Sequence, residues 1–227
     1  MVFDARALLQ IIVESVNKQI DAVSTFSKIA EGGSYRIFEA VFEDKTTVIA
    51  RLPYPCTLPQ SFGIASEVAT MQFLRLHGIP VPQLYAWASS AENAVGSAYM
   101  IMAKAEGQEL EHIWYGMSVS ERKNMMEKIV EIEQRLFQIQ LPASGSIYHK
   151  IFLDSQEGID QVPIETAYTG ENEFSVGPSS EYLWWYGHRD VVLVNRGPCQ
   201  SIRKSAEAGV VLTRIRAALR GCHEISR

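Results

Sequence analysis

Val48-Ile49-Ala50-Arg51-Leu52, followed by Ser66-Glu67-Val68-Ala69-Thr70-Met71, is the stretch that decides the fold of this 227-residue chain. The first run is rich in β-branched residues and predicts a strand over residues 46–52 that contains a cation. The second run belongs to a predicted helix over residues 66–76, which ends at Gly78. Arg51 and Glu67 can therefore form an ion pair between strand and helix. Taken alone, such a pair at a protein surface contributes only about 0–1 kcal/mol.

The segments around this stretch predict a small, mostly β-structured lobe. Residues 37–42 and 46–52 form a hairpin around a polar turn, and the short segment 23–29 is a further candidate strand. Residues 84–87 and 97–102 predict two more strands. Together they give four or five strands and one internal helix. A first helix, capped by Asp4, precedes them, because Leu8, Ile12 and Val16 recur at helical spacing.

A glycine turn and a hinge-like strand complete the pattern of a nucleotide half-site. Successive amides of Gly32-Gly33-Ser34 can form an anion nest, although a plain turn explains them as well. In kinases a strand cation contacts nucleotide phosphates and is held by a glutamate on the next helix. Residues 99–102 would then lead into the hinge that contacts the adenine, or they are only an apolar strand. The candidate nucleotide-binding residues are Gly32, Gly33, Ser34, Arg51, Glu67 and Met102.

These runs resemble the fungal aminoglycoside phosphotransferase-like family, and its closest branch looks like the altered-inheritance-of-mitochondria protein nine group. Glu31-Gly32-Gly33-Ser34-Tyr35, the two opening runs, and the later Phe174-Ser175-Val176-Gly177-Pro178 carry the resemblance over about residues 2–215. The resemblance implies a protein-kinase-like α+β fold with ATP and Mg²⁺ bound between a β-rich small lobe and a mainly helical large lobe. By the same resemblance, Gly32, Gly33 and Ser34 lie over phosphate, Arg51 contacts phosphate and Glu67 holds Arg51.

The catalytic half of such a site is not found where the family has it. We expect a His-x-Asp-x-x-x-x-Asn loop and a later metal-binding aspartate, but Asp190 is the last aspartate of the sequence. His188-Arg189-Asp190 with Asn195 fits the kinase pattern, with Asp190 as base and Asn195 as magnesium ligand. The run Asn195-Arg196-Gly197-Pro198 precedes the catalytic loop in the family, which favours chance or packing over catalysis. We therefore assign no catalytic residue and no metal ligand.

The expected organisation is an N-terminal helix over 1–19, a small lobe over 20–104 and a partial large lobe over 105–227 that is C-terminally truncated. A capping box at Ser118 and Glu121 opens the best-defined helix, with Met125, Ile129 and Ile132 on one face. Residues 141–200 predict irregular, packed loop with short elements, and residues 206–219 a last, basic helix.

Composition limits the other function classes. The formal charge is −5 with 47% hydrophobic residues, which argues against a general nucleic-acid binder. Three scattered cysteines give neither a disulfide framework nor a metal motif. No apolar stretch is long enough to span a membrane, and no leader precedes the first helix. The residues therefore predict a cytoplasmic protein, whereas the resemblance implies mitochondria.

Three functions remain open at this point. The first is a catalytically incomplete phosphotransferase-family protein that keeps a residual ATP- or phosphate-binding half-site. The second is a regulatory or scaffolding pseudokinase module whose exposed half-lobe binds a protein partner. The third is an active ATP-dependent small-molecule phosphotransferase that uses Asp190.

Overall fold

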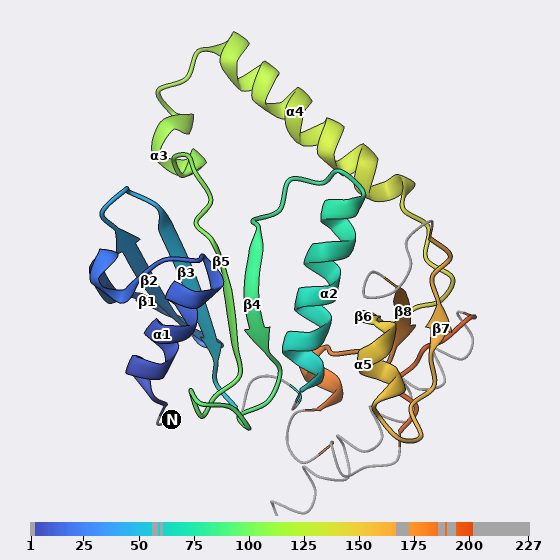
Figure 1. Cartoon of the computed structure of the whole chain (residues 1–227). Helices are drawn as coiled ribbons and strands as arrows, with labels where there is room; N and C mark the ends of the chain where they lie inside the picture. Colours follow the sequence, from blue (N-terminus) through green and yellow to red (C-terminus); the bar gives the residue numbers. More distant parts are fainter. Residues whose placement is uncertain are drawn as a thin grey trace, which may run out of the picture.

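The computed structural model describes residues 3–55, 59, 61–166, 173–185, 189 and 194–201, and these form a mixed α+β fold. Figure 1 shows a five-stranded sheet on one side, a three-stranded sheet on the other, and helix α2 between them. The α+β class expected from the sequence is confirmed.

The larger sheet is antiparallel throughout, and its strand order is β1-β2-β3-β5-β4. All of its strands lie close to the segments that the alternating pattern predicted. The strands are β1 (Val23–Glu31), β2 (Tyr35–Phe42), β3 (Thr47–Pro53), β4 (Leu84–Ala88) and β5 (Tyr99–Ala103).

Helix α1 (Ala5–Ser15) covers one face of this sheet. Asp4 caps the helix, because its carboxylate accepts hydrogen bonds from the amides of Arg6 and Ala7. The apolar face of α1 packs against alternate residues of the strands, including Val48, Ala50 and Leu52 of β3. Full burial of a valine or leucine side chain contributes about 1.5–3 kcal/mol to the stability of the fold. Helix α1 and this sheet share one hydrophobic core.

Helix α2 (Phe62–Leu76) covers the opposite face and begins four residues before the predicted start. Its residues Ile64 and Val68 pack on Met100 and Met102 of β5. The other side of α2 presents Ala69 and Phe73 to the second sheet. Because α2 is apolar on two sides, it forms part of two cores at once.

The second sheet was not predicted as a sheet. Its strands are β6 (Ser146–His149), β7 (Val162–Pro163) and β8 (Phe174–Gly177), in the order β6-β8-β7. Strands of two to four residues are too short for an alternating pattern to stand out. The short helix α5 (Lys150–Asp154) and the 3₁₀ turn η3 (Tyr182–Trp184) complete this part of the fold, whereas the 3₁₀ turn η1 (Ile20–Ala22) lies between α1 and β1. The predicted helix over 206–219 lies outside the described residues.

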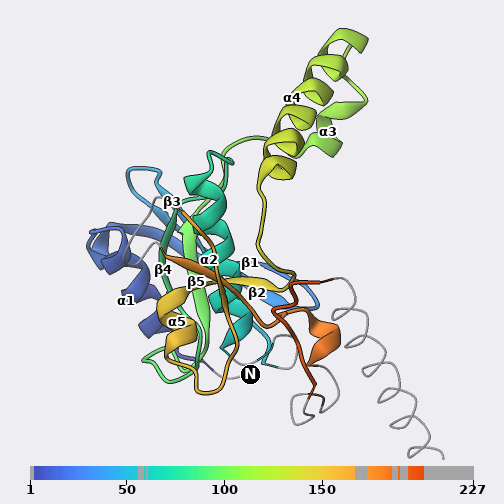
Figure 2. The same ribbon diagram turned by 90° about the vertical axis from the view of Figure 1, so that its right-hand side faces the viewer.

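Helices α3 (Leu110–Trp114) and α4 (Val119–Gln138) form an arch that joins the two halves. Figure 2 shows α4 projecting away from both sheets. The capping box at Ser118 and Glu121 is present, as the sequence predicted. Within the described ranges, no helix combines the length and the apolar character needed to cross a membrane.

Candidate functional site

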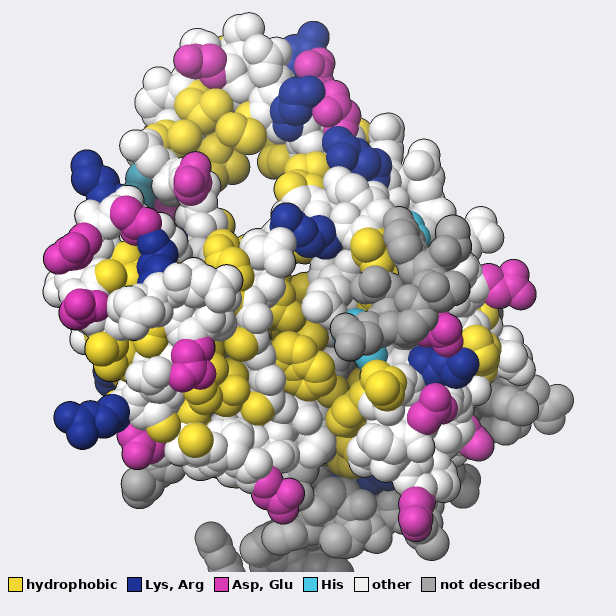
Figure 3. All heavy atoms as spheres, in the orientation of Figure 1, with side chains coloured by type: hydrophobic (Ala, Val, Ile, Leu, Met, Phe, Trp, Pro, Cys, Tyr) yellow, Lys and Arg dark blue, Asp and Glu magenta, His cyan; other side chains and the backbone are white. Residues whose placement is uncertain are grey.

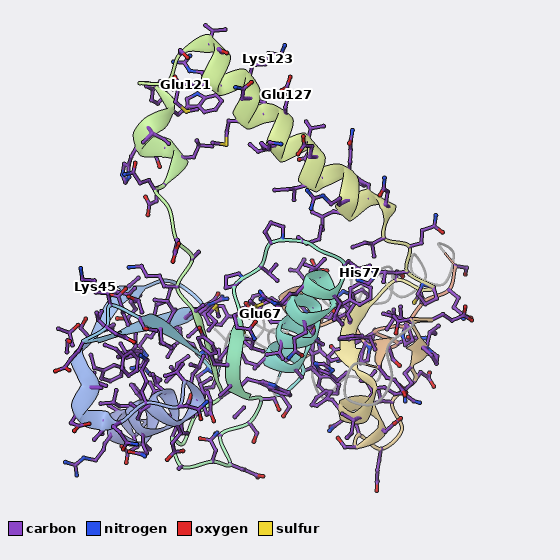
Figure 4. All side chains as sticks on the ribbon, turned by 45° about the horizontal axis from the view of Figure 1, so that its top comes forward. Lys45, Glu67, His77, Glu121, Lys123 and Glu127 are labelled. Atoms are coloured by element: carbon purple, nitrogen blue, oxygen red, sulfur yellow. The ribbon has the colours of Figure 1, made fainter. Side chains whose placement is uncertain are left out.

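Arg51 and Glu67 form the ion pair that the sequence predicted. Residues alternate across β3, so Arg51 points away from the α1 core and towards α2. Its Nη1 donates a hydrogen bond of 2.5 Å to Oε1 of Glu67, which Figure 4 marks on α2. About a quarter of each side chain is exposed, so the pair is half-buried and open to solvent on one side.

Tyr35, at the start of β2, is a third member of this site that sequence reasoning missed. Its hydroxyl donates a 2.7 Å hydrogen bond to Oε2 of Glu67, and its ring centroid lies 4.2 Å from Cζ of Arg51. Burial of the phenol, and then the negative charge of Glu67, raise the pKa of Tyr35 well above its usual range. Tyr35 therefore remains a hydrogen-bond donor at any physiological pH.

A sequence signal for Tyr35 did exist. The register of the sheet pairs Ile37 with Arg51, and Tyr35 lies two residues earlier on the same strand. Residues two apart on a strand share a face, so Tyr35 and Arg51 had to point to the same side.

The arrangement leaves Arg51 with donors to spare. Both oxygens of Glu67 are engaged, one by Arg51 and one by Tyr35. A guanidinium has five N–H groups in one plane, and the Glu67 contact uses one of them. The guanidinium of Arg51 contacts the Tyr35 ring and the Glu67 carboxylate, and its edge is exposed. Its remaining N–H groups can therefore donate hydrogen bonds to an anionic oxygen ligand.

The glycine turn differs from the predicted anion nest. Neither Gly32 nor Gly33 has the left-handed backbone that alternates with right-handed residues in a nest. The amide of Gly32 instead donates to the carbonyl of Tyr35 at 3.0 Å and closes the turn. Methyl groups added at either glycine would meet no atom within 4 Å. The space over the turn is therefore open, and it lies about 10 Å beyond Arg51 along the sheet.

The side chain of Met102 points into the core, so the predicted hinge contact to an adenine would be made by backbone. The side chain is 6% exposed and belongs to the apolar cluster under α2. The next two amides are used within the sheet, by Ala103 to Gln83 and by Lys104 to Thr47. The amides of Ala103 and Lys104 are therefore not free to bind an adenine.

A nearby hollow of about 620 Å³ is a different feature. It lies between the loop after β3, the start of α2 and the β4–β5 loop. Pro53, Tyr54, Ile64 and Ser97 are among its lining residues, whereas Arg51 and Glu67 are not.

The alternative catalytic pattern is described only in part. His188 and Asp190 lie outside the described residues. The side-chain oxygen of Asn195 accepts a 2.8 Å hydrogen bond from the amide of Gly197, which forms a local turn. In the part of the chain that the structure describes, no three His, Cys, Asp or Glu side chains gather in a way that could hold a metal ion.

Comparison with known proteins finds fungal relatives, while no family model matches the chain. A subtelomeric hrmA-associated cluster protein of Aspergillus fumigatus is 38% identical over 183 residues, which are 80% of this chain and 34% of that protein. Altered inheritance of mitochondria protein 9, mitochondrial, of Saccharomyces cerevisiae is 31% identical over 179 residues, covering 72% of this chain and 28% of that protein. The protein of the same name from Candida tropicalis is 30% identical over 172 residues.

These findings confirm the expected similarity to the altered-inheritance-of-mitochondria group. The names of these relatives mention neither a kinase nor a phosphotransferase. The chain spans about a third of the length of the curated relatives it matches.

Proposed function

We propose that this chain contains the small lobe of a kinase-like fold, similar to that of aminoglycoside phosphotransferases, and that it binds the phosphates of a nucleotide. The proposed site consists of Arg51, Glu67 and Tyr35, with the turn at Gly32, Gly33 and Ser34 over the phosphate chain. The adenine of the bound nucleotide would contact the part of the chain that follows Met102 and β5.

The observation that carries the proposal is the Arg51–Glu67 pair between β3 and α2. It occurs at the strand and helix where kinases hold their phosphate-contacting cation. The antiparallel sheet with one helix between β3 and β4, and the open space over the glycine turn, also support it.

The proposal is limited to binding. Phosphoryl transfer depends on a positioned base and on metal charge. The one candidate base, Asp190, lies outside the described residues, and the described residues do not fit a magnesium site of their own. Magnesium would therefore arrive with the nucleotide and be held mainly by its phosphates.

Isothermal titration with Mg-ATP tests this function. We expect binding by the wild type and at least a tenfold loss in Arg51→Met, because a charge-assisted hydrogen bond contributes about 1.5–3 kcal/mol. Lys150→Met is the matched control, because Lys150 also pairs with a glutamate, Glu173 at 3.0 Å, but on the second sheet. Unchanged affinity in Arg51→Met, or no binding by the wild type, would rule the proposal out.

A second candidate is a regulatory or scaffolding role, and the exposure of α4 favours it. No residue of this 20-residue helix is buried, although its sequence carries a continuous apolar side. Loss of partner capture, with Mg-ATP binding retained, after polar substitutions on α4 would separate this role from nucleotide binding.

The cellular location also remains a proposal. The yeast relatives carry the word mitochondrial in their names, and we infer the same compartment for this protein. Fractionation of cells that express the tagged natural gene product, with the protein found only in the cytosol, would refute this.

A further inference from the structure

Helix α4 carries charged pairs on one side and exposed apolar residues beside them. Lys123 pairs with Glu127 at 3.8 Å and Lys128 pairs with Glu131 at 2.9 Å. Figure 4 marks Lys123 and Glu127 on the outer side of the arch. Figure 3 shows an opening under the arch, with hydrophobic side chains along its edge. No residue of α4 is buried, and its exposed apolar residues have no covering layer in the described part of the chain.

The most exposed apolar residues of α4 form one line. Val119, Met126, Val130 and Phe137 are separated by seven, four and seven residues, so they point within about 20° of one direction on an ideal helix. Their exposed fractions are 82%, 47%, 43% and 86%. Tyr115, just before the helix, is also 85% exposed. We call the four helix residues Val119, Met126, Val130 and Phe137 the α4 stripe.

The spacing of the α4 stripe is symmetric along the helix. Val119 and Phe137 are equally far from residue 128, and so are Met126 and Val130. If a second copy of the helix packs antiparallel against the first, Val119 of one copy lies opposite Phe137 of the other. In the same way, Met126 of one copy lies opposite Val130 of the other. A surface that matches itself in this way is what a two-fold symmetric dimer requires.

The charges beside the α4 stripe fit the same arrangement. Arg122 lies six residues before the centre and Glu133 five residues after it, and both lie on the same side of the stripe. In the antiparallel pair, Arg122 of one chain would face Glu133 of the other, twice. Arg122 is already fixed on this side by hydrogen bonds to the carbonyls of Trp114 and Tyr115.

We propose that two copies of this chain associate through an antiparallel pairing of their α4 stripes. A helix of 20 residues is about 30 Å long, so the buried area falls at the small end of specific interfaces. We expect a reversible dimer, as is usual for interfaces at this end of the size range. This proposal does not depend on nucleotide binding.

The concentration dependence of the molecular mass tests the dimer. Light scattering on the whole chain between about 1 and about 100 µM should show the mass rise towards twice the monomer value. Met126→Glu should raise the dissociation constant at least tenfold, because it places like charges at the centre of the pair. Ile151→Glu is the matched control, since Ile151 is 69% exposed on a different helix, α5. Circular dichroism should show that both variants keep the wild-type helix content.

Cysteine cross-linking tests the orientation. In the antiparallel pair, residue 126 of one chain lies next to residue 130 of the other, within the ~7 Å between Cα atoms that a disulfide allows. A mixture of Met126→Cys and Val130→Cys chains should cross-link several times more than either variant alone or the wild type.

Three outcomes would overturn the proposal. One is a monomer at every concentration tested, which would mean that something other than a second copy covers the stripe. Another is a dimer that Met126→Glu leaves intact. The third is a stronger cross-link within one cysteine variant than in the mixture, which would indicate parallel helices.

Discussion

Arg51 makes two different contacts, an ion pair with the carboxylate of Glu67 and a cation–π contact with the ring of Tyr35. A lysine could form the ion pair, but it lacks the flat, delocalised group that stacks on Tyr35. The arginine at position 51 and the presence of Tyr35 are therefore parts of one arrangement. The sequence revealed the ion pair through its spacing, whereas the stacking depends on the register of β2 and β3.

Tyr35→Phe separates the hydrogen bond from the stacking. The substitution keeps the ring under Arg51 but frees one oxygen of Glu67, which then turns towards solvent. We expect a two- to tenfold loss of Mg-ATP affinity, corresponding to about 0.5–1.5 kcal/mol for one hydrogen bond. Isothermal titration measures it, and Tyr85→Phe on β4 is the control because that ring is exposed. Affinity equal to that of the wild type would show that Tyr35 does not position the pair.

Tyr148 makes the free energy of unfolding depend on pH in the alkaline range. Its hydroxyl donates a 2.7 Å hydrogen bond to the carbonyl of Pro178, and burial raises the pKa of Tyr148 well above its usual range. The unfolded chain releases this proton near pH 10, whereas the folded chain keeps it. The contribution of the protonated Tyr148 hydroxyl to the free energy of unfolding is therefore complete below about pH 10. It is lost progressively as the pH rises above that value.

Urea titrations at pH 8 and at about pH 11 measure this contribution. Tyr148→Phe should cost about 1–3 kcal/mol at pH 8, because it leaves a buried carbonyl without its donor. It should also flatten the loss of stability towards high pH. Tyr115→Phe is the control at an exposed position. The same alkaline slope in Tyr148→Phe and the wild type would contradict the assignment.

At the scale of elements, the success of prediction followed the length of the element. The strands of the large sheet and helix α4 carry enough residues for a period to appear, and all were found within a few residues. Helix α2 began earlier than predicted because Phe62, which is partly buried, and Ile64, which is buried, pack into different clusters, which blurs a one-sided pattern. Strands β6, β7 and β8 are defined by pairing with distant segments, which local sequence does not encode.

Helix α4 should depend on its cap more than the other helices do. No side chain of α4 is buried, so packing adds little, and Ser118 and Glu121 satisfy each other's backbone amides at its start. Ser118→Ala should lower the protection of α4 amides in hydrogen exchange by about 0.5–2 kcal/mol. The sheet amides should be unaffected. Ser120→Ala in the same turn is the control, and an equal effect of both variants would contradict a role for the cap.

Helix α2 packs against both sheets, so the part of the molecule that the structure describes has one continuous structural centre. Helix α2 presents Ile64 and Val68 to the large sheet and Phe73 to the small one. The β-rich lobe predicted over residues 20–104 is therefore connected to the later segment through side chains as well as through the chain. Sequence reasoning treated α2 as part of the first lobe alone, because the strands on its far side were not visible in the pattern.

Cooperative unfolding of both halves follows from this arrangement. Phe73 is 1% exposed, and its ring packs edge-on against Phe174 of β8 with centroids 5.4 Å apart. Phe73→Ala should cost about 3–5 kcal/mol by leaving a cavity. Since a loosened α2 also uncovers Met100 and Met102, amides of β3 and β5 should lose as much protection in hydrogen exchange as those of β6 and β8. Ile151→Ala, at an exposed position, should change neither set. Loss of protection confined to β6 and β8 would show instead that the small sheet unfolds by itself, and that α2 belongs energetically to the large sheet alone.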